Sequence, residues 1–546
     1  MTRRSAVARR IRMAIGLLVA ATAVTAVTAC GPDQGVLTLG AEPSPRSSRG
    51  TPETTTPPTD GSSVEPTEPT SPSEPSEPTA GPTDDATSTT VPVEEPDLPP
   101  IVEPELAVEI PIEDVVDVGD RKPSRDHDTF VAVAFTDIER WWGEIFPAVY
   151  RGEFEPLSGG IYAGYPGRSD DLPGCGEQRT DYQDLNLYVA FYCQFDDFMI
   201  YDDGDRSLLT ELADEYGPAV MGIVLAHEYG HTIQQRTGAL DRFLPTIVTE
   251  QQADCFAGAW AGQAYRGESP LLRLGDRDVR TGLVAMLNVS DPVGTDQFSQ
   301  GGHGSAFDRA GAFQEGLIVG PARCAELLDD PLPLMPNQFL DLSDASREGN
   351  ASYDCSDDPD PNCTPAPTFL ADDLNDFWPA VLPGFEPLAP APVDGLDGAG
   401  CSAPIVVADL AAVCETERVV AYDEPDVLEL YQQIGDFSLG YLYGVGWAEV
   451  AQQELGTELT GERRALLNDC FVGAWTRDIT LGLRYTEREG TALISAGDLD
   501  EAIQMAILTG DEGANVNVAG SPFEKIESFR VGVLGGFDAC TARFLQ

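Results

Sequence analysis

Lysine is almost absent from this chain of 546 residues, since only Lys122 and Lys525 occur and every other basic residue is arginine. Lys and Arg together number 33 against 91 Asp and Glu, which gives a formal net charge of −58. Phosphate backbones and anionic lipid headgroups are bound by basic surfaces, so this composition argues against nucleic-acid binding and against adsorption to anionic membranes. The acidity fits either a saline habitat or a codon bias, and composition alone does not separate the two.

Long apolar runs are also missing after the first thirty residues, so no later segment predicts a membrane-spanning helix. Hydrophobic residues nevertheless make up 42% of the chain, which is enough for a sizeable core. The length predicts two to four domains.

The N-terminus resembles a bacterial lipoprotein signal. Five arginines between residues 3 and 12 precede an uncharged, apolar stretch, Met13–Ala29, which ends in Val27-Thr28-Ala29-Cys30. We therefore predict a signal peptide over residues 1–29 and a lipidated Cys30. The mature protein is then extracytoplasmic, at the bacterial cell surface, and touches the membrane only through its lipid anchor. A plain secretory signal and an uncleaved membrane anchor are the alternatives.

A segment rich in Pro, Thr, Ser and Glu follows the signal. It has few large apolar side chains and cannot offset the entropy of ordering, so residues 30–108 are predicted to be a disordered stalk. Residues 41–104 hold thirteen acids and two arginines, a net charge of only −11. Most of the negative charge is therefore expected on the folded domains.

One predicted helix carries the chemistry. Residues 218–238 form an apolar run with Pro218 at its start and Gly238 at its end, which is typical of a helix with a buried face. His227 and His231 lie four residues apart, so they share one helix face and can hold a single Zn²⁺. Glu228 is placed to act as general base on a water molecule at the metal.

The third zinc ligand must come from another segment, and Glu250 is the natural candidate. Asp254, one helical turn later, faces the same way and can accept a hydrogen bond from a ligand imidazole. Two His, one Glu and an open position indicate a catalytic zinc site, with one Zn²⁺ per chain.

The chain has only two other histidines. His303 lies in the glycine-rich segment Gly301-Gly302-His303-Gly304 and is a candidate to stabilise the oxyanion of a tetrahedral intermediate. A loop histidine that only packs or caps locally is the alternative. His127, between Asp126 and Asp128, is interpreted as a solvated turn residue.

Several segments together resemble the neutral zinc metallopeptidases of bacteria. In chain order these segments are Cys175-Gly176, Ala190-Phe191-Tyr192-Cys193, Ile200-Tyr201-Asp202, His227-Glu228-Tyr229-Gly230-His231, Glu250 to Trp260, and His303-Gly304-Ser305. The resemblance covers roughly Val131 to Cys324. It implies a gluzincin-type, zinc-dependent peptidase with an α+β, mainly helical, zincin-like fold.

The chain contains this domain twice. A scan for internal repeats aligns Asp254–Trp260 with Asp469–Trp475, and Gly304-Ser305 with Gly520-Ser521. In the second copy Val445, Gly446, Glu449, Ala465 and Ala519 stand where the first has His227, Glu228, His231, Glu250 and His303. We predict a metallopeptidase domain over residues 109–330, an Asp/Pro-rich connector over 331–370, and a degenerate, zinc-free domain over 371–546.

Ten cysteines remain besides Cys30, an even number in an oxidising compartment. The repeat matches Cys175, Cys193, Cys255 and Cys324 with Cys401, Cys414, Cys470 and Cys540. The simplest pairing in each copy is first with second and third with fourth, which leaves Cys355 with Cys363.

These observations predict an extracytoplasmic, lipid-anchored zinc metallopeptidase that hydrolyses peptide bonds of a peptide or protein substrate. The competing interpretation is an inactive surface binding or scaffold protein with a structural or vestigial zinc site. The sequence indicates neither the natural substrate nor the oligomeric state.

Overall fold

The computed structural model describes residues 104–546, except 169–171, 177–179, 184, 186–188, 300, 340, 357, 359–360, 362, 399, 403, 408–409, 482, 484–494 and 511–519. The predicted signal peptide, the lipidated Cys30 and the stalk up to residue 103 lie outside the described residues, as does Ala519. Below, residues 104–330 are called the first half and residues 366–546 the second half.

The first half combines helices with short strands. Its elements are β1 (Glu105–Leu106), η2 (Ile112–Asp114), α2 (Asp128–Tyr150), β2 (Gly160–Gly164), β3 (Ala190–Cys193), β4 (Phe198–Asp202), α4 (Leu208–Tyr216), α5 (Ala219–Thr237), α6 (Thr246–Tyr265), β5 (Leu272–Arg273), α7 (Asp276–Asn288), α8 (Ala306–Val319) and α9 (Pro321–Glu326).

The second half repeats most of this order after the short connector helix α10 (Leu342–Ser346). Its elements are α11 (Ala366–Val381), β6 (Ala389–Val393), η4 (Leu396–Gly398), β7 (Ile405–Val407), β8 (Ala411–Cys414), β9 (Val419–Asp423), α12 (Glu424–Gln433), α13 (Phe437–Glu454), α14 (Gly461–Thr480), α15 (Asp498–Thr509) and α16 (Pro522–Leu545). The architecture is mixed α and β, with helices in the majority, as expected.

The main sheets of the two halves have the same local topology. In the first half β2 runs parallel to β4, and β3 pairs antiparallel on the other side of β4. In the second half β6 runs parallel to β9, and β8 pairs antiparallel on its other side, with β7 added at the edge. The registers agree, since Cys193 faces Phe198 and Cys414 faces Val419.

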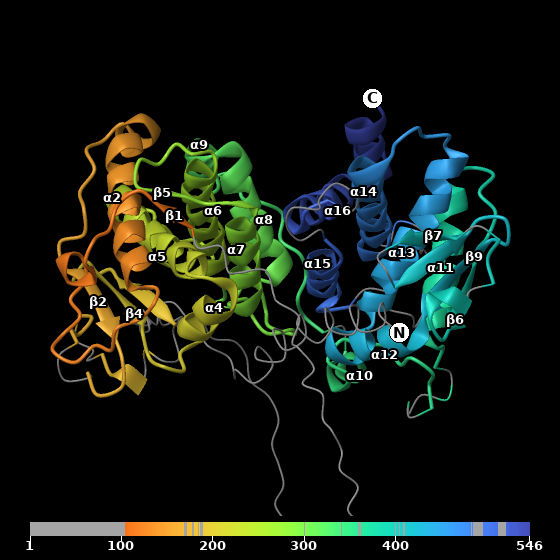
Figure 1. The fold of residues 1–546 in the computed structure, drawn as a ribbon, viewed down its shortest axis with the longest axis horizontal. Coiled ribbons are helices and arrows are strands. Elements are labelled where there is room, and N and C mark those ends of the chain that lie inside the picture. Colours follow the sequence, from red (N-terminus) through yellow and green to blue (C-terminus); the bar gives the residue numbers. More distant parts are fainter. Residues whose placement is uncertain are drawn as a thin grey trace, which may run out of the picture. The chain divides into compact units, whose positions relative to one another are not determined.

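The helices of each half pack in corresponding pairs. Helix α6 lies against α5 and α8, and α14 lies against α13 and α16 (Figure 1). Close approach depends on glycine: a Cβ at Gly258 would meet the Phe313 carbonyl oxygen at 1.9 Å, and one at Gly473 would meet that of Phe529 at 2.0 Å. A larger side chain would therefore force either pair of helices apart.

A buried tryptophan is fixed in the same way in each half. Trp260 on α6 donates its indole N–H to Asp137 on α2, at 3.0 Å. Trp475 on α14 donates its indole N–H to Asp373 on α11, at 2.7 Å. These hydrogen bonds satisfy the one polar group of each buried ring.

The two halves share one apolar core. Phe307 on α8 packs edge-on against Phe529 on α16, with the ring centroids 6.2 Å apart. Asp500 on α15 accepts a hydrogen bond at 2.8 Å from the backbone N–H of Phe307, in the first turn of α8. The second half thus supplies a capping group to a helix of the first.

Five disulfide bonds join the cysteines in the expected pairs. Cys175–Cys193 and Cys255–Cys324 lie in the first half, Cys355–Cys363 in the connector, and Cys401–Cys414 and Cys470–Cys540 in the second half. The bonds between the third and fourth cysteine of each half close loops of nearly equal length, with sequence separations of 69 and 70.

Two of the expected domain boundaries are wrong. The stalk was expected to reach residue 108, but Glu105 and Leu106 form β1, which pairs antiparallel with β5. The connector was expected to reach residue 370, but α11 already begins at Ala366, because its apolar side chains belong to the core. Among the described helices, none combines the length and apolarity needed to cross a bilayer.

Candidate metal centre

Two adjacent helices present the expected metal ligands. Helix α5 begins after Pro218 and ends at Gly238, whose φ of 71° suits a glycine C-cap. Helix α6 crosses it closely at Gly230, where an added Cβ would lie 3.0 Å from Ala253 Cα. Because Gly230 lies directly before His231 on α5, this close crossing brings α6 to the histidines.

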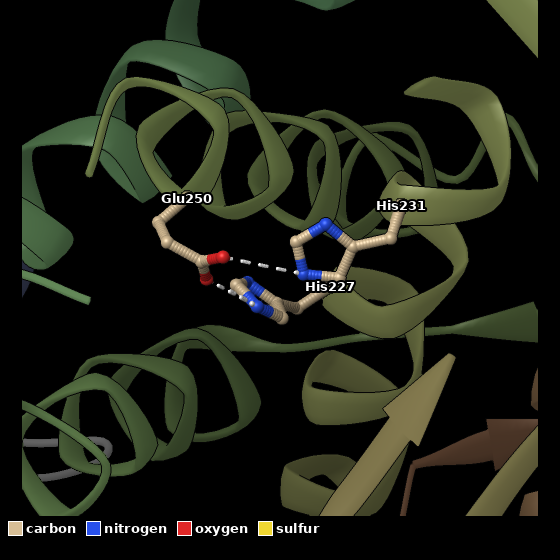
Figure 2. A group of neighbouring side chains, drawn as sticks. All are labelled: His227, His231 and Glu250. Atoms are coloured by element: carbon tan, nitrogen blue, oxygen red, sulfur yellow. Dashed lines mark ion pairs between the residues drawn. The ribbon is translucent and has the colours of Figure 1, made fainter. Parts of the chain in front are cut away.

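The three predicted ligands converge (Figure 2). His227 Nε2 lies 3.2 Å from Glu250 Oε2, and His231 Nε2 lies 3.6 Å from Glu250 Oε1. One donor atom from each of the three residues lies within 4.8 Å of the others, and all three side chains are buried. The imidazole rings stand at 90° to each other, with centroids 5.0 Å apart.

The second nitrogen of each imidazole has a partner that orients the ring. His227 Nδ1 lies 2.7 Å from Asp254 Oδ1, which is the contact expected for Asp254. His231 Nδ1 lies 2.9 Å from Gln234 Oε1, and Gln234 in turn donates to the Thr249 carbonyl at 2.6 Å. An acceptor at Nδ1 favours a proton there and leaves the lone pair on Nε2, toward Glu250.

Asp254 is itself held by a buried arginine. Arg309 on α8 donates to both Asp254 oxygens, at 3.0 and 2.8 Å. It also donates to the Val289 carbonyl. Burial alone would raise the pKa of Asp254, but Arg309 and His227 outweigh it and lower that pKa. The carboxylate therefore stays charged and can fix the His227 tautomer.

The electrostatics of the three ligands favour a cation. Burial alone would raise the pKa of Glu250, but His231, His303 and His227 hold it well below its usual range. Burial lowers the pKa of His227, yet Asp254 and Glu250 outweigh that effect and raise it to about 10. Asp254 and Glu250 thus favour a positive charge at the position between them.

The donor set fits zinc. Two neutral imidazoles and one carboxylate are a ligand combination that zinc enzymes use, and hydrogen bonds to the second imidazole nitrogens accompany such sites. No fourth protein ligand joins the group among the described residues. The site is therefore chemically suited to a metal with an open coordination position.

The two predicted catalytic residues differ in how closely the structure places them. Glu228 is buried and follows His227 on α5. His303 is buried as well, and its Nε2 lies 4.0 Å from Glu250 Oε2. Asp291 accepts the backbone N–H groups of both His303 and Gly304 at 2.8 Å, which anchors this loop beside the ligands.

Sequence reasoning missed three residues of this centre. Gln234 orients His231, Arg309 pairs with Asp254, and Asp291 anchors the His303 loop. Only Gln234 carried a signal, since it recurs as Gln452 in the second half. Arg309 and Asp291 come from segments without a recognisable ligand motif.

The interpretation of His127 as a solvated residue is wrong. Its side chain is only 4% exposed, and its Nε2 lies 3.0 Å from Asp203 Oδ1. Asp203 is also paired with Lys122, at 3.1 Å, and with Arg125, at 3.4 Å. The flanking acids suggested a solvated turn, whereas the long-range partner Asp203 buries the ring within a charge-balanced network.

In the second half, the position that aligns with His231 is occupied by a residue in an internal ion pair. Glu449, the counterpart of His231, accepts from Arg464 at 2.7 Å and from Asn468 at 2.9 Å. Val445 and Gly446 occupy the positions of His227 and Glu228 on α13. The described residues there form no cluster of two imidazoles and a carboxylate.

The retained aspartate has a different partner set in the second half. Asp469 accepts from Lys525 at 2.9 and 2.8 Å and from Tyr441 at 2.6 Å. Lys525 lies four residues after Ser521, the N-cap of α16, just as Arg309 lies four residues after Ser305, the N-cap of α8. Lys525 thus takes the place of Arg309, and Tyr441 takes the place of the imidazole. Asp254 therefore has an architectural role as well as its contact with the ligand.

Comparison with known proteins supports the resemblance seen in the sequence. Residues 115–324 match the family model described as "Putative neutral zinc metallopeptidase". The match confirms the resemblance seen in the sequence, and it ends at Cys324, so the second half lies outside it.

Relatives of this metallopeptidase segment occur in distant bacteria. An uncharacterized protein of Mycobacterium tuberculosis is 28% identical over 211 residues, which cover 35% of this chain and 67% of the relative. The uncharacterized protein YpfJ of Escherichia coli is 28% identical over 224 residues, 36% of this chain and 69% of the relative. No solved structure matches the chain.

Proposed function

We propose that the first half is a zinc-dependent peptidase. His227, His231 and Glu250 hold one Zn²⁺, and Glu228 is the general base. The observation that carries this proposal is the convergence of both Nε2 atoms on Glu250, with each Nδ1 already engaged by Asp254 or Gln234. The match of residues 115–324 to the zinc metallopeptidase family model supports it independently.

The protein residues divide the reaction between them. Bound Zn²⁺ supplies a Lewis acid that polarises the peptide carbonyl and lowers the pKa of a water molecule. Glu228 takes the proton from the attacking water and passes it to the leaving amine. His303, next to the ligands, donates to the oxygen that becomes negative in the transition state.

The second half is proposed to be a degenerate copy of the first that binds no zinc. The same strand pairing, the same disulfide spacing and the same Trp–Asp contact support a duplication. The replacement of His231 by Glu449, paired with Arg464, supports the loss of zinc. We propose that this copy packs against the catalytic half through α15 and α16.

The cellular context rests on the N-terminal sequence. We propose that the mature protein is anchored at the outer face of the cell membrane through lipidated Cys30 and a disordered stalk. Its substrates would then be peptides or proteins of the cell envelope or its surroundings. The acidic surface disfavours acidic substrates.

The decisive experiment separates zinc binding from cleavage. Glu228→Gln removes the base but leaves the three ligands, so zinc should stay at one per chain while cleavage of fluorescein-labelled casein falls about 10²- to 10⁴-fold. Glu211→Gln, on the exposed side of α4, is the matched control and should cleave like wild type. A Glu228→Gln variant that keeps its zinc and cleaves as fast as wild type would overturn the mechanism and favour the scaffold interpretation.

A further inference from the structure

Three carboxylates from two helix starts meet in the second half. Asp436 precedes α13, Asp498 is the first residue of α15, and Glu501 follows on the next turn. One oxygen of each lies within 4.8 Å of one oxygen of each of the others. Their exposed fractions are 7%, 2% and 6%. This carboxylate cluster thus holds three acids in a small, buried volume.

No basic side chain neutralises the carboxylate cluster. Within the described parts of the chain, no Lys, Arg or His forms an ion pair with any of its three members. Two buried acids at the centres of the halves do have such partners: Asp254 pairs with Arg309, and Asp469 pairs with Lys525. A buried charge without a partner is strongly unfavourable, so the carboxylate cluster requires either protons or a cation.

The hydrogen bonds of the carboxylate cluster leave acceptor capacity unused. One oxygen of each member accepts a backbone N–H, from Ala351 at 2.8 Å, from Ser495 at 2.8 Å and from Phe437 at 2.7 Å, for Asp436, Asp498 and Glu501 respectively. Asp436 Oδ1 is buried and has no hydrogen-bond partner. Burial raises the pKa of all three carboxyls despite these backbone donors, and the neighbouring carboxylates add to this effect for Asp498 and Glu501. Without a cation the carboxylate cluster therefore holds protons, which a divalent cation would displace.

The first half lacks this arrangement at the same helix starts. Helix α5 is preceded by Pro218, where α13 is preceded by Asp436. The fourth residue of α7 is Val279, where the fourth residue of α15 is Glu501. The carboxylate cluster is therefore a feature of the half in which the zinc ligands are replaced.

We propose that the carboxylate cluster binds one oxygen-preferring divalent cation, Ca²⁺ or Mg²⁺. Carboxylate and carbonyl oxygens are the ligands that these hard cations select, whereas imidazole suits zinc. The two halves would then bind different metals, because the first offers imidazole nitrogens and the second offers only oxygens. This proposal is independent of the peptidase mechanism.

A cation in the carboxylate cluster would also affect the first half indirectly. Asp500 lies between Asp498 and Glu501 on α15, and it accepts the Phe307 N–H at the start of α8. The ion would join the start of α13 to the first turn of α15 and, through Asp500, hold α8 in place. Its expected effect is therefore on the stability of the whole folded chain.

The test uses the purified protein, stripped of metal and reloaded with one equivalent of Zn²⁺. CaCl₂ and MgCl₂ are titrated separately by calorimetry, and thermal unfolding is followed in parallel. We expect one ion to bind per chain and Tm to rise on the order of 5 °C at a hundredfold excess over Kd. The titration that shows binding and a rise in Tm identifies the cation, and this result with either CaCl₂ or MgCl₂ supports the proposal.

Variants of the carboxylate cluster supply the control for folding. Asp436→Asn and Glu501→Gln should lose the calcium or magnesium response, yet unfold at or above the wild-type Tm without added cation, because mutual repulsion is relieved. Asp538→Asn, at an exposed position on α16, should keep the response. The proposal is overturned if wild type responds to neither ion at millimolar concentration, or if Asp436→Asn binds as tightly as wild type. Stability that rises only on acidification, without a cation effect, also contradicts it.

Discussion

The two halves of the chain share an arrangement of strands and helices but differ in the side chains at its centre, between α5 and α6 in the first half and between α13 and α14 in the second. In the first half two imidazoles face Glu250 across adjacent helices, while in the second Glu449 is paired with Arg464. The disulfide between the third and fourth cysteine and the tryptophan–aspartate contact are present in both. Residues common to the halves therefore build the fold, and those confined to the first build the metal centre.

The difference also shows how the second half keeps its buried acids paired without the histidines of the first. If the histidines were only replaced by apolar residues, the buried acids beside them would lose their hydrogen-bond partners. The second half instead supplies Arg464 and Asn468 to Glu449, and Lys525 and Tyr441 to Asp469. Each remaining buried acid at this place thus keeps its hydrogen bonds and a positive neighbour.

The largest expected effect on zinc binding and cleavage comes from replacing a ligand of the first half by the residue at the equivalent position of the second half. His227→Val copies Val445 and removes a ligand, so bound zinc should fall from one per chain to none. Peptide cleavage should then drop at least about a thousandfold, because the metal contributes several kcal/mol to transition-state stabilisation. Zinc content by elemental analysis and casein cleavage measure the two losses.

The reciprocal change is the control. Val445→His should leave zinc at one per chain, because Glu449 is engaged by Arg464 and Ala465 stands in place of Glu250. A second equivalent of zinc in this variant would show that the two central places are more alike than proposed.

The disulfides test whether the halves are equally stabilised. Replacing Cys255 and Cys324 together by alanine should lower the free energy of unfolding by about 4 kcal/mol, and the same change at Cys470 and Cys540 should cost about as much. The reason is that the two closed loops have nearly the same length. Urea denaturation under oxidising conditions measures both, and clearly unequal losses would contradict equivalent roles.

The paired aspartates separate a metal role from an architectural one. Asp254→Asn should weaken zinc binding about 10- to 100-fold, because the His227 ring loses the charged acceptor that orients it. Asp469→Asn should leave the zinc affinity unchanged, since Asp469 contacts Lys525 and Tyr441 instead. Competition with a chromophoric chelator measures both, and an equal loss in the two variants would refute the distinction.

The last comparison concerns the third residue of two matched helices, Asp308 in α8 and Glu524 in α16. Burial raises the pKa of Asp308 to about 7, although the Met335 N–H opposes this. Between about pH 4 and 7 the folded protein keeps a proton that the unfolded chain has lost. The free energy of unfolding should therefore fall as pH rises through this window, by at most about 1.4 kcal/mol per pH unit.

Asp308→Asn should remove this contribution, whereas Glu524→Gln should leave it in place. Denaturant titrations of wild type and both variants across the window measure the slopes. If Asp308→Asn has the wild-type slope, another group accounts for the pH dependence.

Much of the fold and the core of the site could be predicted from local pattern. The four-residue spacing of His227 and His231 requires only helical geometry, and the second aspartate–cysteine motif revealed the repeated cysteine positions. Domain boundaries were less accurate, because the apolar start of α11 falls within a polar, proline-rich stretch. His127 was misread because its flanking acids gave no sign of its partner Asp203, 76 residues away.

The sequence by itself predicted the three residues that converge at the candidate metal centre, the proposed general base and the cysteine pairs, because helical period and internal repetition are visible along the chain. Only the tertiary structure decided that Arg309 holds Asp254, that Asp500 caps a helix of the other half, and that Asp436 meets Asp498 and Glu501. Those contacts join residues 55 to 193 positions apart, or elements separated by a long stretch of chain. Their formation depends on how the helices pack rather than on any spacing in the sequence.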